Sequence, residues 1–113
     1  MDLSLTTRSD GDTTVVEVAG EIDVYTAPQL RTCFIDAIDS GARDVVADMT
    51  DVTFLDSTGL GILVGARRRA VDAGGDLRLI ITHSAVLKIF RITGLDKVFS
   101  IEVALDKAVT PAA

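Results

Sequence analysis

The sequence predicts an α/β fold in which helices flank a central mixed β-sheet of about five strands. Segments rich in β-branched residues alternate with amphipathic segments, in the order β-β-α-β-α-β-α-β-α along the chain. This alternation favours parallel neighbours in the sheet, joined by right-handed crossovers. Hydrophobic residues make up 48% of the 113 residues, so a core can form without a metal or a disulfide. We therefore expect one domain over residues 1–113, with a disordered tail at 109–113.

A hairpin and a helix are predicted for the first part of the chain. Residues 3–7 and 13–19 have the alternating or β-branched pattern of strands, and the turn signal Asp10-Gly11-Asp12 lies between them. Thr26 is a candidate N-cap for the next helix, which has one apolar face and ends at Gly41.

The remainder of the chain continues the alternation. The expected elements are a short strand at 45–49, a short apolar stretch at 52–55 that leads into a helix from Ser57 to about Ala73, a strand at 77–81, a helix capped by Ser84 and closed by Gly94, a strand at 98–103 and a short helix at 104–109. In sheets of this kind, functional sites gather in the loops past the carboxyl ends of the strands. Two such loops are polar here, at residues 21–23 and 56–59.

Charge and composition exclude several classes of function. The net charge is −6 and no basic stripe offsets it, so we do not expect nucleic-acid binding; Arg67-Arg68-Arg69 is interpreted as a solvated helix end. No apolar run reaches the ~18–20 residues that span a bilayer, and no leader segment is evident, so no membrane association is expected. A single cysteine, Cys33, is interpreted as a small buried residue, and these features together indicate the cytoplasm.

Ser57 lies where the N-cap of the second helix is expected. A cap hydroxyl accepts a hydrogen bond from a backbone N–H two or three residues ahead, and the positive end of the helix dipole favours anions there. A phosphate on Ser57 would meet the same N–H groups, so the fold should tolerate phosphorylation. The local sequence leaves two interpretations of Ser57 open, a phosphate acceptor or only a cap.

The helix after Ser57 contains three glycines, each of which costs about 1 kcal/mol in a helix interior. The residues expected on its core face are Leu60, Leu63, Val64, Ala70 and Val71. Those expected on the other face are Thr58, Gly61, Ile62, Gly65 and Arg69. That second face would be smooth, with an exposed Ile62 as a docking contact for a partner. Tight packing on the chain's own sheet would explain the glycines equally well.

Three enzymatic or nucleotide-binding interpretations fit less well. The glycine spacing of residues 59–65 resembles a dinucleotide-binding loop, but the next strand ends without an acidic residue for the ribose. A receiver-type phosphoaspartate would need an acidic pair that Glu21 and Asp23 do not match, and a lysine where Thr82-His83 stands. His83, the single histidine, lacks the surrounding motif of a serine hydrolase, and no zinc or P-loop motif is present.

Four separated motifs resemble those of STAS-domain anti-sigma factor antagonists. They occur in order as Gly20-Glu21-Ile22-Asp23, Thr26-Ala27, Phe54-Leu55-Asp56-Ser57-Thr58-Gly59-Leu60-Gly61 and Ile92-Thr93-Gly94-Leu95. Residues 1–5, 20–28 and 87–99 are similar to the actinobacterial BldG type in particular. The resemblance covers nearly the whole chain and implies the STAS fold.

The resemblance also implies a regulatory cycle. The unmodified protein would bind a cytoplasmic anti-sigma factor, commonly a serine protein kinase of the histidine-kinase ATPase fold, and so release a sigma factor for transcription. That kinase would use its own ATP and Mg²⁺ to phosphorylate Ser57, and a PP2C-type phosphatase would reverse the reaction. The chain itself would be no enzyme, hold no cofactor, act as a monomer or weak dimer, and serve stress or developmental signalling.

The same resemblance implies the residues of the site. Asp23 and Asp56 would lie beside Ser57, and Thr58 stands where many members have serine, so it is not expected to be the main acceptor. The residues expected to contact the partner are Glu21, Asp23, Thr26, Asp56, Thr58, Gly59, Gly61, Ile62 and Gly65. The alternative function is a nucleotide-binding STAS scaffold module that phosphorylation does not regulate.

Overall fold

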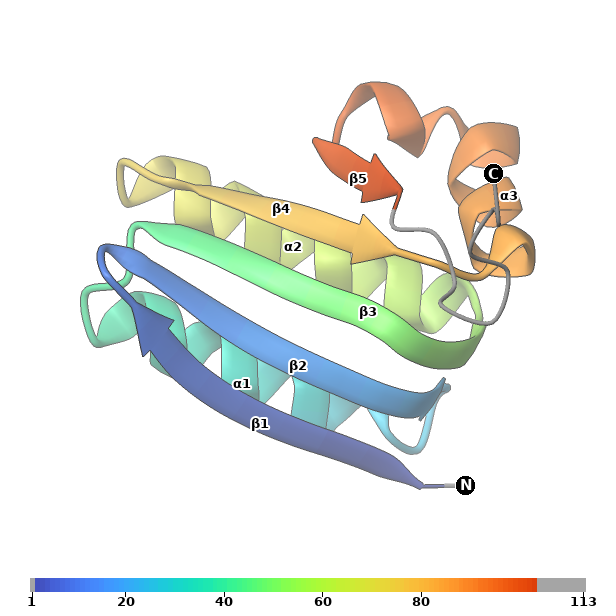
Figure 1. Ribbon diagram of the computed structural model, residues 1–113, viewed down its shortest axis with the longest axis horizontal. Coiled ribbons are helices and arrows are strands. Elements are labelled where there is room, and N and C mark those ends of the chain that lie inside the picture. Colours follow the sequence, from blue (N-terminus) through green and yellow to red (C-terminus); the bar gives the residue numbers. More distant parts are fainter. Residues whose placement is uncertain (1, 104–113) are drawn as a thin grey trace, which may run out of the picture.

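A long hairpin opens the fold. In the computed structural model, which describes residues 2–103, β1 (Leu3–Asp10) and β2 (Thr13–Ile22) pair antiparallel (Figure 1). Leu3 and Leu5 pack against the core while the polar residues between them face solvent, as the alternation predicts. The hairpin therefore supplies one edge of the sheet and the strand next to it.

Three further strands add in parallel, each after a helix. The elements are α1 (Ala27–Asp39), β3 (Asp44–Leu55), α2 (Ser57–Asp72), β4 (Asp76–Ile81), α3 (Ser84–Thr93), the 3₁₀ turn η1 (Leu95–Lys97) and β5 (Ile101–Val103). The strand order is β1-β2-β3-β4-β5, which confirms the predicted mixed sheet of five strands. Because β2, β3 and β4 run in one direction, their carboxyl ends meet at one end of the sheet.

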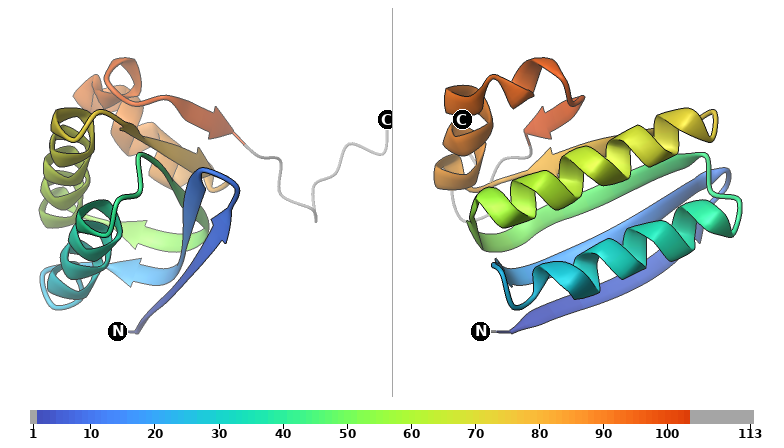
Figure 2. Two further views of the ribbon diagram at one scale, coloured as in Figure 1. Left: turned by 90° about the vertical axis from the view of Figure 1, so that its left-hand side faces the viewer. Right: turned by 180° about the vertical axis from the view of Figure 1, so that it is seen from behind.

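The core lies between the sheet and two helices. Figure 2 shows α1 and α2 side by side on one face of the sheet, with α3 at the end of the sheet near β4 and β5. The largest fully buried side chains are Phe34, Phe90, Ile22, Leu30, Met49, Leu63, Leu77, Leu79 and Ile81. They come from all three helices and three strands, so the helices are fixed firmly to the sheet.

β3 is one continuous strand from Asp44 to Leu55, which corrects the prediction of a short strand that ends at residue 49. It pairs with β2 from Asp44 to Leu55. The pairing register shifts between Glu17 and Ala19 and again between Gly20 and Glu21 of β2, and at each shift β3 has one residue more than β2. Backbone pairing across the sheet thus keeps extended a segment whose own sequence looks broken.

The last predicted strand begins later than expected. Gly94 closes α3 in the left-handed conformation (φ 75°), and η1 follows it directly. Phe99 turns inward onto Phe90, with ring centroids 5.8 Å apart at 88°, so the chain becomes extended only at Ile101. The predicted helix at 104–109 and the tail at 109–113 lie outside the described residues.

Candidate functional site

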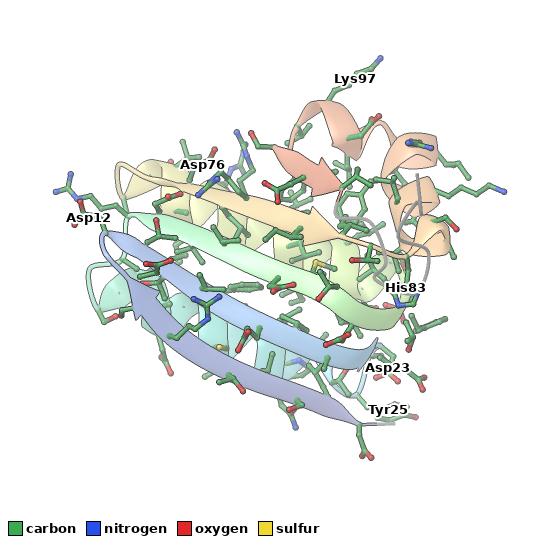
Figure 3. All side chains as sticks on the ribbon, in the orientation of Figure 1. Asp12, Asp23, Tyr25, Asp76, His83 and Lys97 are labelled. Carbon is green, nitrogen blue, oxygen red and sulfur yellow. The ribbon has the colours of Figure 1, made fainter. Side chains whose placement is uncertain are left out.

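The two polar loops lie next to each other at the carboxyl ends of β2 and β3. Ile22 and Leu55 are paired in the sheet, and the N–H of Asp56 donates a 3.3 Å hydrogen bond to the carbonyl of Ile22. Figure 3 shows Asp23 and Tyr25 at this end of the sheet and Asp76 at the opposite end. The sheet therefore brings together the acidic loop and the start of α2, as predicted from the sequence.

Asp56, not Ser57, is the N-cap of α2. Its backbone is extended (φ −109°, ψ −175°), and its side chain accepts a 3.1 Å hydrogen bond from the N–H of Gly59. Ser57 is the first residue inside the helix, so the prediction of a Ser57 cap is wrong. Pairing of β3 with β2 runs up to Leu55, so the first residue past the strand, Asp56, takes the cap position.

The cap by Asp56 leaves Ser57 free. Ser57 is exposed, and among the residues that the structure describes its hydroxyl makes no hydrogen bond. The chain before it is held by the sheet and the chain after it is helical, so the hydroxyl stands on a rigid base. Thr58, beside it, is also exposed. This geometry removes the interpretation of Ser57 as only a cap.

Asp23 and Thr26 are buried and hold the acidic loop together. One oxygen of Asp23 accepts hydrogen bonds from the N–H groups of Tyr25 (2.9 Å) and Thr26 (3.0 Å). The hydroxyl of Thr26 accepts from the N–H of Asp23 (2.9 Å) and donates to the carbonyl of Glu21 (2.8 Å). The backbone N–H of Thr26 is the main cause that lowers the pKa of the Asp23 carboxyl, and the N–H of Tyr25 lowers it further.

These bonds change what Asp23 and Thr26 can do. Both side chains are less than one-tenth exposed, so a partner could reach little of either. Thr26 precedes α1 as predicted, but its hydroxyl holds the loop and makes no cap bond to the helix. We therefore assign both residues to the shape of the loop, and their direct contact with a partner stays a prediction. Glu21, which is half-buried, keeps an accessible part.

Sequence reasoning missed the two residues that this loop exposes. The side chain of Tyr25 is 84% exposed and that of Val24 is 58% exposed. Apolar residues are not expected on a turn by pattern alone, and the sole signal was their position directly after Asp23 in a polar loop. The exposure became visible only with the hydrogen bonds that shape the turn.

Gly59 is required by packing and not by docking. It is buried, and a Cβ placed on it would lie 2.5 Å from Ile22 Cγ2 and 2.5 Å from Leu55 Cδ1. Only glycine lets the first turn of α2 approach the ends of both strands this closely. The packing explains why this position is glycine, and the contact of Gly59 with a partner stays a prediction.

Gly61 and Gly65 behave differently, because both are exposed and a Cβ on either would meet no atom within 4 Å. They line a shallow groove of about 140 Å³ between α1 and α2, together with Ile62. Ile62 is half-buried against the core, so it is not the lone exposed contact that was predicted. The groove, rather than a single side chain, is what this face of α2 offers.

The core face of α2 is also rotated from the prediction. Ala66 is buried, whereas Val64 is 39% exposed and Val71 is 44% exposed. The helix packs on α1 as well as on the sheet, and this second contact turns the small residues inward.

Among the described residues, no side chain caps the N-terminus of α3. His83, and not the predicted Ser84, occupies its N-cap, and the carbonyl of His83 accepts from the N–H of Leu87 at 3.0 Å.

In the part of the chain that the structure describes, no group of three or more His, Cys, Asp or Glu side chains could hold a metal ion. Over the same residues no helix has the length and apolar character to cross a bilayer.

Comparison with known proteins identifies the family. A model of the STAS domain family matches residues 4–108. The chain belongs to this family. The anti-sigma-B factor antagonist of Bacillus subtilis is 36% identical over 101 residues, which cover 89% of this chain and 92% of that protein. Identity of this level over nearly all of both chains places the protein among the STAS-domain anti-sigma factor antagonists.

Solved structures agree with this assignment. A crystal structure of an anti-sigma factor antagonist from Mycobacterium paratuberculosis is 30% identical, with a TM-score of 0.84 over 96% of this chain and 92% of that one. The Bacillus cell fate determinant SpoIIAA in its phosphorylated form is 23% identical, with a TM-score of 0.71 over 93% of this chain and 95% of that one. The second likeness shows that this STAS protein shares the fold of SpoIIAA.

Proposed function

We propose that the unphosphorylated protein binds an anti-sigma factor through the surface around Ser57, and that this binding releases a sigma factor for transcription. The observation that supports the proposal is an exposed serine hydroxyl, free of internal hydrogen bonds, on the rigid first turn of α2 in a STAS-domain anti-sigma factor antagonist. The protein is a regulator that acts by binding and not an enzyme.

Phosphorylation of Ser57 would switch the binding off. The partner would be a serine protein kinase of the histidine-kinase ATPase fold that brings its own ATP and Mg²⁺. The Ser57 oxygen would attack the γ-phosphorus of ATP as the bond to ADP breaks, and the hydroxyl proton would pass to a base on the kinase. A PP2C-type phosphatase would hydrolyse the phosphoserine and restore the binder. The accessible hydroxyl supports this sequence of events.

Repulsion at the interface would drive the release. A phosphate adds about −1.5 to −2 charge. It would lie next to the carboxylate of Asp56, which already takes the N–H of Gly59, so the first turn has fewer donors left for it than an open helix end. Like charges brought together in an interface cost several kcal/mol, which corresponds to a loss of about a hundredfold or more in affinity.

The proposed contact surface follows from exposure. Glu21, Asp56, Thr58, Gly61 and Gly65 are exposed or half-buried around Ser57 or along the adjoining groove. Ile62 would contribute the floor of that groove. The actinobacterial BldG type and a cytoplasmic location belong to the same proposal.

Two measurements with candidate anti-sigma kinases from the source organism test this function. Mass spectrometry after incubation with ATP should locate one phosphate on Ser57, and titration should show tight binding before that reaction and weak binding after it. Ser57→Ala should bind the kinase equally well, and ATP should no longer release it. If Ser57→Ala folds but fails to bind, or if phosphate appears only elsewhere, the proposed switch is wrong.

A further inference from the structure

We propose that Val24 and Tyr25 form an apolar anchor that enters a pocket of the anti-sigma partner, and that Asp23 is the positioning residue that holds this anchor beside Ser57. The inference rests on the proposed function and deepens it, because it names the chemistry of the partner's surface: an apolar pocket with a basic rim. The anchor consists of the side chains of Val24 and Tyr25.

The first support is the rigid geometry of the loop. One oxygen of Asp23 accepts from the N–H groups of Tyr25 and Thr26, and the Thr26 hydroxyl ties the loop back to the carbonyl of Glu21. With these groups turned inward, Tyr25 projects outward (Figure 3), and Val24 beside it is exposed as well. A loop whose backbone is held this way loses little conformational freedom on binding, which favours affinity.

The second support is where the molecule exposes its aromatic rings. The sequence has four phenylalanines and one tyrosine. Phe34, Phe90 and Phe99 are buried, whereas Tyr25 and Phe54 are exposed. Phe54 lies one residue before Leu55, at the same end of the sheet as Tyr25. Tyrosine is enriched among the residues that dominate binding energies, because it combines a large apolar ring with a polar tip.

The third support is continuity with the Ser57 surface. The hydrogen bond from the Asp56 N–H to the Ile22 carbonyl joins the two loops directly. The loop that carries the anchor begins one residue after Ile22, and Ser57 follows Asp56. A kinase that brings ATP to Ser57 would therefore lie over this end of the sheet, where Tyr25 projects.

Charge defines the rim of the pocket. Glu21 and Asp56 flank the anchor, and within residues 2–103 neither forms an ion pair. Their carboxylates would be left facing the partner, so the surface around the apolar pocket should carry lysine or arginine. The anchor supplies affinity in both states of Ser57, and the phosphate acts against it by repulsion from the rest of the interface.

Tyr25→Ala tests the anchor with the kinase that phosphorylates Ser57. Its dissociation constant for the unphosphorylated protein should rise about 30-fold, the effect of losing one dominant contact. In the phosphorylation assay KM should rise with kcat nearly unchanged, because the anchor holds ground state and transition state equally. Tyr25→Phe should stay within about 3-fold of wild type. An unchanged dissociation constant for Tyr25→Ala overturns the proposal.

Val71→Ala is the matched control for the loss of an exposed apolar side chain. Val71 is 44% exposed and lies at the other end of α2, about 20 Å along the helix axis from Ser57. This variant should bind like wild type. Each variant should keep the wild-type melting temperature within a few degrees, because the side chains removed are exposed. If Val71→Ala weakened binding as much as Tyr25→Ala, loss of any exposed apolar side chain would have the same effect, and the proposed anchor would be wrong.

Two substitutions separate a positioning role of Asp23 from a charged contact. Asp23→Asn keeps the oxygen that accepts from Tyr25 and Thr26 and should bind within about 5-fold of wild type. Asp23→Ala removes that oxygen and should weaken binding by about as much as Tyr25→Ala. The double variant with Tyr25→Ala should add little more, because both changes remove the same contact. A large loss in Asp23→Asn, or full additivity in the double variant, overturns the positioning role.

The outcome also separates this inference from the proposed function. If Ser57→Asp weakens binding but Tyr25→Ala does not, the switch stands and the anchor is wrong. If Tyr25→Ala weakens binding but phosphorylation of Ser57 does not, the anchor stands and the switch is wrong.

Discussion

The two ends of the sheet hold their carboxylates in different ways. At the end away from the site, Asp44 accepts hydrogen bonds from Arg78 at 3.2 and 3.0 Å, and Arg67 and Arg69 pair with acids from neighbouring elements. At the end with the site, Asp23 and Asp56 are bound by backbone N–H groups, and in the described part of the chain neither has an arginine or lysine partner.

The difference has a functional meaning. An arginine neutralises the acid that it binds, whereas a backbone N–H fixes a carboxylate in place and leaves its net charge intact. The charge of Asp44 at the far end is thus offset by Arg78, whereas Asp23 and Asp56 at the site end keep their negative charge in fixed positions. That arrangement suits a surface that must attract a basic partner and then repel it when one phosphate is added.

The largest expected effect is on kinase affinity, when a negative charge is added at one end of the sheet or at the other. Ser57→Asp should weaken binding of the anti-sigma kinase by about a hundredfold, since a charge enters the interface. Ser9→Asp adds the same charge to an exposed position near the hairpin turn and should change the affinity less than 3-fold. Titration calorimetry measures both, and similar losses would mean that overall charge rather than the site controls binding. A carboxylate imitates a phosphate only in part, so the phosphorylated protein sets the upper limit.

The next effect is on stability and concerns the glycines of α2. Gly59→Ala should lower the free energy of unfolding by about 1–3 kcal/mol, because its methyl group would overlap Ile22 and Leu55. Gly65→Ala, in open space on the same helix, should raise it by about 0.4–1 kcal/mol. Urea denaturation at pH 7 measures both. Equal effects at the two positions would mean that the start of α2 is not packed as described.

The cap of α2 has a smaller effect. Asp56→Ala should destabilise the protein by about 1 kcal/mol, because the N–H of Gly59 loses its acceptor. Asp56→Ser should recover most of this loss, since a hydroxyl can also cap. Failure of both variants to differ from wild type in urea would show that another group caps the helix in solution.

A substitution at the far end of the sheet should have little effect on stability and none on binding of the kinase. Arg78→Gln breaks the pair with Asp44 and should cost at most about 1 kcal/mol of unfolding free energy, less in 1 M salt because this pair is partly exposed. Binding of the anti-sigma kinase should not change. A clear loss of affinity in this variant would mean that the two ends are not independent.

The smallest effect is a difference in how two aspartates respond to acid and salt. The pKa of Asp23 is lowered first by the Thr26 N–H, and that of Asp44 first by Arg78. Both folded pKa values lie below the ordinary value of about 3.9, so the stability that each carboxylate contributes is present above that pH and is lost as pH falls through the folded pKa. The difference in unfolding free energy between wild type and Asp23→Asn should therefore disappear as the pH is lowered. The same difference should not change in 1 M salt. For Asp44→Asn, the difference from wild type should become smaller both at low pH and in 1 M salt. Equal effects of salt on the two variants would contradict the causes given for the two pKa values.

Much of the fold could be predicted because the signals are local. Hydrophobic periodicity lies within each segment, so the five strands, the helices and the left-handed Gly94 followed from the sequence. The continuity of β3 did not, because the polar middle of that strand is kept extended by pairing with β2. The face of α2 was also misjudged, because α1 buries Ala66 and leaves Val64 exposed.

The candidate site divides in the same way. The sequence by itself determined that a serine follows an aspartate at the start of a helix, at the end of a parallel strand, in a chain with the motifs of an anti-sigma factor antagonist. Tertiary structure alone decided that Asp56 takes the cap and frees Ser57, that Gly59 is buried, and that Tyr25 projects. The exposure of a side chain depends on groups that are distant in the chain and close in space. The cap bond of Asp56 is local, but the residue at which α2 begins depends on where β3 stops pairing with β2.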